Sequence, residues 1–376
     1  MEAYLQMNQF EMLPLIEKYH PIKLFVKIIV GSICKIAKFK RILTNSDSGG
    51  ITIIVLHKIG DSIFTTHAIK KVVEYHANKP ISIICFPETK LIYQISFPGV
   101  EVLTIPHHYF WKGRIATHKA KKILKGTNSK IIYDLTGAIT SATLIAFSKA
   151  ENIVGMNLEY FEPLYDKFCP LRKTPHLNDM YMDVVKMVFA VEDNVSYEFP
   201  FSVGQTNKVL IHPHAGWKAK EWGLEKYFEV AQKLSSQYEV EVIAEAGSLS
   251  EDIKKHIQEK FRLIEAESIE NLIEGIKNCA VFIGNDSGPI YIANMLGKPT
   301  FTIYGPTNPK YSKPFGEHHV EVHKEVSCSP IHTQYCFTDA GRKCPDYICT
   351  RNLTVNEVYI KILDFLSKEK IQKHAV

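Results

Sequence analysis

Residues 51–61 read ITIIVLHKIGD, and residues 281–289 read VFIGNDSGP. Each stretch begins as an apolar run, which is typical of a strand buried on both faces of a parallel sheet. Each then passes through a turn of small and polar residues into a segment with helical periodicity. Open α/β sheets bind ligands at the carboxyl ends of such strands. The two stretches therefore predict two parallel-sheet units, each with a candidate site where a strand passes into a helix.

Short apolar runs alternate with helix-like periodicity on either side of these stretches. The runs are rich in β-branched residues and are bounded by Gly, Pro or polar residues, which favours strands. We predict strands at residues 51–56, 81–86, 100–105 and 131–135 in the first half, and at 209–212, 240–244, 281–284 and 300–304 in the second. This alternation predicts an α/β fold with two Rossmann-like domains facing each other across a cleft.

Changes in composition predict the domain boundaries. Residues 45–50 (NSDSGG) read as a polar linker, and Pro200 and Gly204 mark the crossing between the two domains. The predicted parts are an N-terminal helical extension and linker at 1–50, a first Rossmann-like domain at 51–203, a second at 204–353 with a Cys-rich loop at 326–350, and a C-terminal helix at 354–376 that is open to packing back on the first domain.

Composition narrows the function class. The chain has 376 residues, 45% of them hydrophobic, and a formal net charge of +5, so it can fill two cores and is mildly basic. It lacks a dense Lys/Arg stripe interleaved with aromatic residues, which argues against nucleic acid as a partner. It also lacks a G-x-G-x-x-G turn and a P-loop at its strand ends, which argues against a Rossmann oxidoreductase and a P-loop enzyme.

The N-terminal segment has the pattern of a basic amphipathic helix. Residues 24–39 are the most apolar stretch, but they include Lys27, Lys35 and Lys38 and are shorter than the roughly 20 apolar residues that span a bilayer. Such a helix packs either on its own domain or on an anionic inner leaflet, and both remain open. Because a signal-peptide layout is missing, we expect a cytoplasmic protein, with peripheral inner-membrane contact as an option.

Residues 210–222, LIHPHAGWKAKEW, predict a phosphate site. A strand leads into a turn of small residues around Gly216, and Lys218 and Lys220 follow before the next helix. A lysine there is a point charge that can offset a diphosphate.

These motifs together resemble a known family. Residues 58–61 (KIGD), 212–222, 284–288 (GNDSG), 297–299 (GKP) and 304–307 (YGPT) closely resemble, in order and spacing, glycosyltransferase family 9, the heptosyltransferases of lipopolysaccharide synthesis. The resemblance implies a GT-B fold in which the first domain binds the acceptor and the second binds ADP-activated heptose. It also implies inverting transfer to a lipopolysaccharide core or related glycan, with no metal or other cofactor needed for catalysis.

Asp61 is the candidate general base. An acceptor hydroxyl is a poor nucleophile near neutral pH, so a carboxylate within hydrogen-bond reach must take its proton. The adjacent Gly60 leaves this turn open to ligand, and Lys58 is a candidate for acceptor phosphate. The alternative is that Asp61 only caps the helix that begins nearby.

Donor binding is predicted on the second domain. Negative charge grows on the diphosphate as the sugar–phosphate bond breaks, and a preformed cation stabilises it. Lys220 matches the phosphate-binding lysine of the family, while Ser287 and the amide of Gly288 would bind phosphate at a helix start. Asp286 would orient that loop or contact the sugar, and Glu251 stands where the family contacts the nucleoside, although a plain helix-dipole role is the alternative.

Tyr291 departs from the family pattern, which usually has His at this position. Tyrosine can hydrogen-bond a phosphate or sugar but does not carry imidazolium charge near neutral pH. The departure therefore leaves the identity of the donor sugar open.

Four of the eight cysteines crowd into the loop at 326–350, which offers little apolar core. Thiolates suit zinc or iron, yet the spacing is not that of two C-x-x-C knuckles, so a structural metal and free thiols are both open. A branch of the family that glycosylates adhesins carries an iron-binding cysteine finger, and the resemblance extends to this cluster: Cys328, Cys336, Cys344 and Cys349.

Acceptor contacts are predicted in residues 107–114, chiefly at Trp111, Lys112 and Arg114, because rings stack on sugars and cations meet anionic glycans. An ordinary surface loop is the alternative. Two other functions stay open. One is a transferase of the same fold that uses another nucleotide sugar or a protein acceptor, and the other is a non-catalytic nucleotide-sugar-binding or assembly protein.

Overall fold

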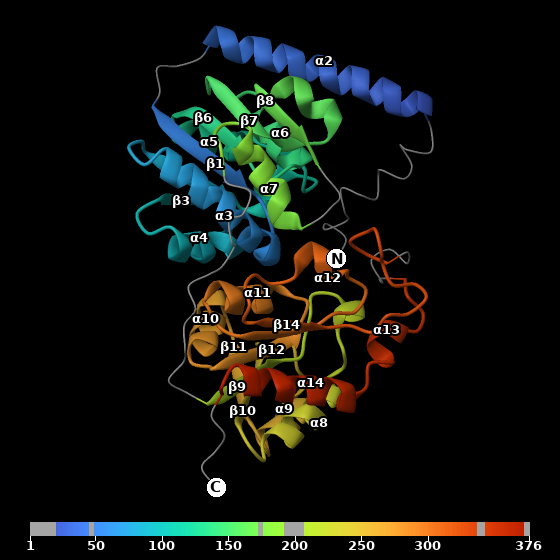
Figure 1. Cartoon of the computed structure of the whole chain (residues 1–376). Coiled ribbons are helices and arrows are strands. Elements are labelled where there is room, and N and C mark those ends of the chain that lie inside the picture. The colour runs from blue at the N-terminus through green and yellow to red at the C-terminus, as the bar shows by residue number, and fades with distance from the viewer. Residues whose placement is uncertain (1–19, 45–48, 172–175, 192–206, 337–342, 372–376) are drawn as a thin grey trace. The chain divides into compact units, whose positions relative to one another are not determined.

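The computed structural model describes residues 20–44, 49–171, 176–191, 207–336 and 343–371. The chain divides into two compact units, Met1–Arg172 with Leu177–Asp193, and Lys173–His176 with Asn194–Val376. Each unit contains a six-stranded parallel sheet flanked by helices (Figure 1). The predicted crossing between domains at residues 199–207 lies almost wholly outside the described residues.

The first unit is built on a sheet with the order β3-β2-β1-β6-β7-β8, in which all neighbouring strands are parallel. Its central strand is buried along its whole length, which is why the sequence there is an unbroken β-branched run. The strands are β1 (Gly50–Val55), β2 (Ile81–Cys85), β3 (Glu101–Thr104), β6 (Ser129–Asp134), β7 (Asn152–Asn157) and β8 (Lys167–Pro170). The helices are α2 (His20–Thr44), α3 (Ile59–Tyr75), α4 (Lys90–Ser96), α5 (His118–Gly126), α6 (Ile139–Ile145) and α7 (Leu177–Lys186).

The second unit repeats this plan with the order β11-β10-β9-β12-β13-β14, again all parallel. The strands are β9 (Lys208–His212), β10 (Glu239–Glu245), β11 (Arg262–Ala266), β12 (Val281–Asn285), β13 (Thr300–Ile303) and β14 (His319–Val322). The helices are α8 (Leu224–Leu234), α9 (Glu251–Gln258), α10 (Ile269–Lys277), α11 (Gly288–Met295), α12 (Pro309–Ser312), α13 (Ile348–Arg351) and α14 (Val355–Lys368).

Both sheets therefore have one doubly wound strand order, in which the connection reverses direction between β1 and β6 and between β9 and β12. Ligands bind at such reversals, outside the carboxyl ends of the strands. The turns at residues 56–61 and 285–288, which decide the fold class from sequence, lie at these two places.

Four strands lack the apolar run that predicts a strand from sequence. β8, β11 and β14 are partly exposed edge strands, so they carry fewer apolar residues. β7 contains Gly155, where a Cβ atom would come within 2.7 Å of the Asp134 carbonyl oxygen. Close packing on Asp134, rather than a turn, requires this glycine.

The two terminal helices pack on different cores. The inner face of α2 contributes Cys34 and Ala37 to the core of the first unit. The C-terminal helix α14, which the sequence left open to packing on the first domain, instead contributes Val358, Ile362 and Phe365 to the core of the second unit.

Candidate active site

The turn after β1 is tied to the turn after β6. The backbone N–H of Leu56 donates to Thr136 Oγ1 at 2.9 Å, and His57 Nε2 lies 2.9 Å from the carbonyl oxygen of Leu135. These bonds cross the place where the strand order reverses. They fix the backbone that leads into α3, and so fix the position of Asp61.

Asp61 lies in the first turn of α3, but the helix N-cap is Lys58. The alternative that Asp61 acts as the capping residue therefore does not describe this helix. Within the described residues the half-buried carboxylate makes no hydrogen bond or ion pair. Its neighbours include the buried phenols of Tyr93 and Tyr181, and burial first, then the Asp61 charge, raises the pKa of Tyr181. Asp61 thus keeps its lone pairs available beside neutral groups, as a general base requires.

The predicted acceptor residues lie at a hairpin tip. Strands β4 (Phe110–Trp111) and β5 (Ile115–Ala116) pair antiparallel. Lys112 and Gly113 connect them with φ of 49° and 68°, the positive values that a tight hairpin turn requires. Lys112 Nζ lies 4.8 Å above the ring of Trp111, which is 61% exposed, and Arg114 follows the turn. The hairpin thus groups an exposed ring with two cations, and acceptor binding there stays a prediction.

In the second unit, Asn285 at the end of β12 joins the turns after β9 and β12. Its Oδ1 accepts hydrogen bonds from the backbone N–H of Trp222 and from the hydroxyl of Tyr227, both at 3.0 Å. Its Nδ2 donates to the carbonyl oxygen of Pro213 at 2.7 Å. A fully buried amide thus holds the lysine-bearing segment against the GNDSG turn.

Asp286 brings together two residues that the sequence treated separately. The side chain is 2% exposed; its Oδ2 accepts a hydrogen bond from Lys220 Nζ at 2.7 Å, and its Oδ1 accepts one from the hydroxyl of Tyr291. Burial first, and then the Asp286 charge, raises the pKa of Tyr291 well above its usual value, so the phenol is a neutral donor. Lys220 Nζ also lies 4.9 Å from the centre of the Trp217 ring. Asp286, Lys220 and Tyr291 thus form one hydrogen-bonded network, with the Lys220 ammonium at its edge.

The other predicted donor residues surround this network unevenly. Ser287 is the N-cap of α11 and Gly288 its first residue. Gly216 is exposed and has open space where a side chain would begin. Glu251 begins α9, where its carboxylate is 89% exposed and lies 2.9 Å from Lys254 Nζ. Donor roles for Tyr291 and for these four residues stay predictions.

Sequence reasoning missed a second carboxylate beside Lys220. Hydrogen bonds from His214 and Lys218 outweigh burial and lower the pKa of Glu221 to about 2. Burial, with the adjacent His214, lowers the pKa of His212 to about 4, so this buried imidazole is neutral. The sequence does place two histidines and two lysines close to Glu221 within residues 212–222. Only the folded turn shows that His214 and Lys218 contact its carboxylate.

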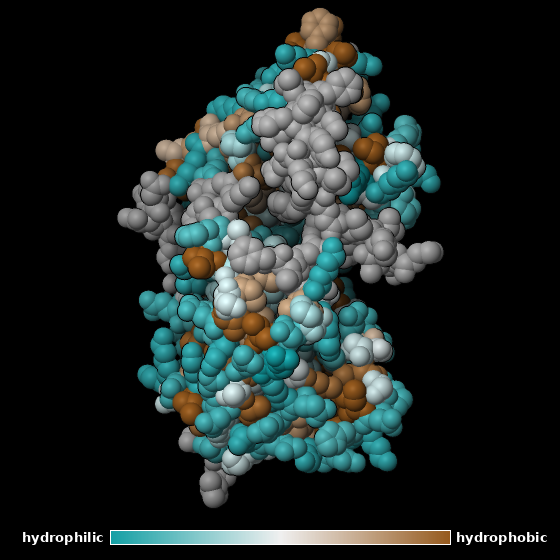
Figure 2. Space-filling view, turned by 90° about the vertical axis from the view of Figure 1, so that its right-hand side faces the viewer, coloured by the Kyte–Doolittle hydropathy of each residue, from teal (hydrophilic) through white to brown (hydrophobic). Residues whose placement is uncertain are grey.

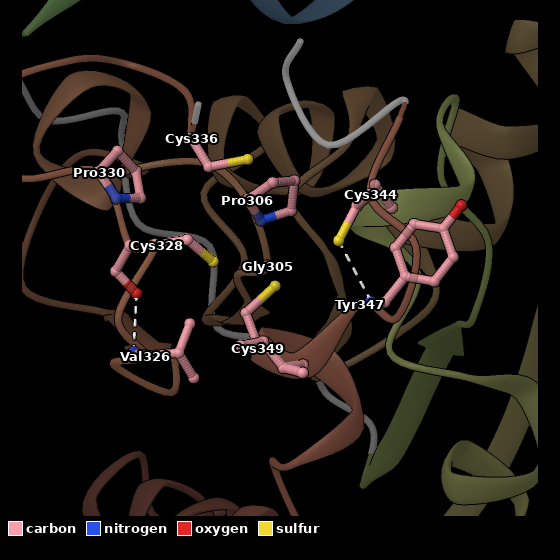
Figure 3. A pocket seen from close by; sticks show the side chains of 12 residues that line it. Gly305, Pro306, Val326, Cys328, Pro330, Cys336, Cys344, Tyr347 and Cys349 are labelled. Atoms are coloured by element: carbon pink, nitrogen blue, oxygen red, sulfur yellow. Dashed lines mark hydrogen bonds between the residues drawn. The ribbon is translucent and has the colours of Figure 1, made fainter. Parts of the chain in front are cut away.

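The four clustered cysteines line one pocket of the second unit. Figure 3 shows their thiols pointing toward a common space beside Gly305 and Pro306. Burial raises the pKa of the Cys349 thiol to about 11, and the backbone N–H of Tyr347 lies 3.3 Å from Cys344 Sγ. Nevertheless, among the described residues no three His, Cys, Asp or Glu side chains are arranged to hold a metal ion. The thiols are gathered, but the predicted metal geometry is not formed.

Comparison with known proteins identifies what this arrangement resembles. The model of glycosyltransferase family 9 (heptosyltransferase) matches residues 117–340. Lipooligosaccharide heptosyltransferase 2 of Campylobacter jejuni is 26% identical over 153 residues, which are 38% of this chain and 48% of that protein. The match thus spans about half the length of this curated relative.

Two solved structures share the fold. The Escherichia coli ADP-heptose lipopolysaccharide heptosyltransferase II superposes with a TM-score of 0.62 at 17% identity, covering 85% of this chain and 99% of that one. A family 9 glycosyltransferase from Veillonella parvula gives a TM-score of 0.69 at 18% identity, covering 86% and 99%. The chain therefore has a GT-B-like α/β fold with two parallel six-stranded sheets, like the heptosyltransferase structures and as the sequence predicts.

Proposed function

The chain belongs to glycosyltransferase family 9, the heptosyltransferases, and we propose that it transfers heptose from ADP-heptose to a lipopolysaccharide core or a related glycan. The transfer would invert the anomeric centre, need no metal or other cofactor, and take place in the cytoplasm. The Campylobacter lipooligosaccharide heptosyltransferase and the Escherichia ADP-heptose lipopolysaccharide heptosyltransferase support the donor and acceptor classes. The observation that carries the proposal is that both strand-order reversals bear family motifs, with Asp61 at one and Lys220 at the other.

Asp61 would act as the general base. The acceptor oxygen forms a bond to the anomeric carbon, the bond from that carbon to the diphosphate oxygen breaks, and the acceptor proton passes to the Asp61 carboxylate. The absence of a hydrogen-bonding partner among the described residues supports this role, because a carboxylate already held by a cation is a weaker base.

Lys220 would stabilise the departing diphosphate. An ammonium has three donors, and the bond to Asp286 uses one of them. Asp286 therefore aims the ammonium without exhausting it, and Tyr291 holds Asp286 from the other side. Ser287 and Gly288 at the start of α11 would add the favourable end of the helix dipole to the same charge.

Acceptor recognition would use residues near the first reversal and the hairpin. Lys58 is exposed in the turn before Asp61, and Gly60 lies beside the proposed base. The exposed Trp111 ring offers a stacking surface for a sugar, and Lys112 and Arg114 offer charges for an anionic glycan.

Tyr291 favours one alternative within the same fold. A neutral phenol bonded to Asp286 replaces the imidazole that the family usually carries, so a different nucleotide sugar remains a second candidate, with either a glycan or a protein as acceptor. A non-catalytic nucleotide-sugar-binding or assembly role is the candidate of another class, and an available base at Asp61 argues against it.

The test is nucleotide selectivity followed by transfer. ADP should raise the melting temperature of the purified protein more than UDP, GDP or CMP do, and the protein should consume ADP-heptose when a heptose-free lipopolysaccharide core is added. Selective stabilisation by UDP or GDP would mean that the protein uses a different nucleotide sugar, and the assignment of the fold would stand. Stabilisation by none of the nucleotides, together with no transfer, would contradict the enzymatic role.

We also propose a structural role for the cysteine loop, in which Cys328, Cys336, Cys344 and Cys349 bind zinc or iron. Four soft donors lining one pocket support the donor chemistry, although the thiols must lose protons and draw closer to coordinate an ion. No step of the transfer passes through this metal. Elemental analysis of natively purified protein should find zinc or iron that is lost in Cys349→Ser and retained in Cys279→Ser, which lies outside the loop. If the native protein contained neither metal, the proposed metal site would be wrong and the four cysteines would be free thiols.

A further inference from the structure

Helix α2 is fixed to the first unit along one face. Arg41 is 2% exposed; its guanidinium donates to the carbonyl oxygens of Ala150 and Glu151 at 3.0 and 2.8 Å and to Asp166 Oδ2 at 2.7 Å. Lys38 Nζ lies 3.0 Å from Asp166 Oδ1 and donates to the carbonyl oxygen of Tyr165 at 2.7 Å. The helix therefore has a defined inner face, and its opposite face is turned away from the first unit.

The outward face is apolar. Seven of its large hydrophobic side chains are between 43% and 68% exposed. Three of them, Ile29, Ile36 and Leu43, are spaced by seven residues and so lie along one line of the helix. The other four, Ile28, Ile33, Phe39 and Ile42, widen this line into a stripe. Hydrophobic side chains lie among hydrophilic ones at the top of Figure 2, the level at which Figure 1 draws α2. We call these seven residues the outer stripe.

Positive charge lies toward both margins of the outer stripe. At 100° per residue, Lys35 and Lys40 fall on opposite sides of the line through Ile29, Ile36 and Leu43. Ile42 lies beyond Lys35 and Ile33 beyond Lys40, and both lysines are exposed. The α2 sequence contains six Lys and Arg residues and no Asp or Glu. An apolar face with lysines toward both margins is the pattern of a helix that lies in the interface of a lipid bilayer.

The charges decide between two possible occupants of this face. If two copies of the chain paired through their outer stripes, Lys35 and Lys40 of both copies would meet, and α2 supplies no acidic residue to neutralise them. An anionic lipid surface meets both requirements, because acyl chains cover the apolar residues and headgroups neutralise the lysines. In the part of the chain that the structure describes, helix length and hydropathy fall short of what crossing a bilayer requires. The arrangement thus favours a helix lying on the surface.

We propose that α2 docks this protein on anionic lipid bilayers, with the outer stripe among the acyl chains and Lys35 and Lys40 among the headgroups. The docking face is separate from Asp61 and Lys220 and does not depend on the proposed transferase activity. It assigns to the N-terminal extension a role in holding the first unit at a membrane surface.

Vesicle sedimentation of the full chain tests this proposal. Vesicles of phosphatidylcholine with phosphatidylglycerol should sediment the protein, and phosphatidylcholine alone should do so at least about tenfold less well. Added salt should weaken the binding to the anionic vesicles. Failure of the wild-type protein to bind anionic vesicles would overturn the proposal.

Variants locate the contact. Ile36→Asp with Leu43→Asp should abolish binding, and Lys35→Glu with Lys40→Glu should remove the preference for phosphatidylglycerol. Ile360→Asp changes an apolar residue on α14 that is 50% exposed, and this variant should bind as the wild type does. Circular dichroism and the melting temperature verify that each variant folds. Wild-type binding by a folded Ile36→Asp, Leu43→Asp protein would contradict the proposal. So would a wild-type dimer that this variant converts to monomer.

Discussion

The two strand-order reversals hold their carboxylates in opposite ways. Asp61 is half-buried and has no hydrogen-bonding partner among the described residues, whereas Asp286 is 2% exposed and accepts hydrogen bonds from Lys220 and Tyr291. The strand orders of the two sheets are the same, so the difference comes from the side chains around each turn. A satisfied carboxylate fixes geometry, and one with free lone pairs can accept a proton. This difference matches the proposed roles, in which Asp61 accepts a proton and Asp286 positions Lys220.

Replacing Asp61 should produce the largest effect on transfer. Asp61→Asn keeps the shape of the side chain and removes the proposed base, so the turnover rate should fall by about 10²- to 10⁴-fold. Nucleotide binding and the melting temperature should change little, because the carboxylate has no described partner to lose. Steady-state kinetics with a nucleotide-binding titration measures both. Near-normal turnover would refute the assignment of the base.

Replacing Lys220 should affect both activity and stability. Lys220→Ala removes the cation that we propose meets the diphosphate, and it should lower turnover by about 10²-fold. It also leaves the buried Asp286 carboxylate without its ion pair, so the free energy of unfolding should fall by about 3 kcal/mol. Kinetics and chemical denaturation measure the two effects.

Lys218→Ala is the matched control for this prediction, because Lys218 is 79% exposed and pairs with Glu221 at the same turn. It should retain turnover. If Lys220→Ala and Lys218→Ala had the same effect on turnover, the proposal that Lys220 stabilises the diphosphate would be wrong.

Lowering the pH should decrease the free energy of unfolding of the second unit. His212 titrates near pH 6.5 in the unfolded chain and near pH 4 when folded, so between these values the unfolded state binds more protons. The stabilising contribution of neutral His212 is complete above pH 6.5 and is lost as the pH falls toward 4, by on the order of 2–3 kcal/mol. Denaturation monitored by the fluorescence of the buried Trp222 reports on this unit. A His212→Asn protein should show a shallower pH slope, and an unchanged slope would contradict the prediction.

Removing the second partner of Asp286 should have the smallest effect. Tyr291→Phe keeps the ring and deletes one hydrogen bond to a carboxylate, so the free energy of unfolding should fall by about 1–3 kcal/mol, with a severalfold loss of donor affinity. Donor affinity measured calorimetrically tests whether Tyr291 acts through Asp286. If Tyr291→His bound ADP more tightly than the wild type does, the tyrosine at this position would influence which nucleotide sugar the protein selects.

Much of the fold was predictable because it follows from local pattern. The apolar runs of β1, β9 and β12 are buried on nearly every residue, so their sequences show strands directly. Partly exposed strands such as β11 gave no such signal, since solvent on one side relaxes the need for apolar residues. The packing of α14 was also not readable, because an amphipathic pattern shows that a helix has an apolar face but not which core receives it.

The sequence by itself determined that this chain forms two parallel-sheet units, and it placed Asp61, Lys220 and Asp286 at strand ends where ligands bind. Only the tertiary structure decided what those side chains do there. It joined Lys220 and Asp286 in one ion pair across 66 positions of sequence, left Asp61 without a described partner, and turned the outer stripe of α2 away from the core. The physical reason is that strand and helix patterns arise from neighbours in sequence, whereas burial and charge pairing depend on residues that folding alone brings within reach.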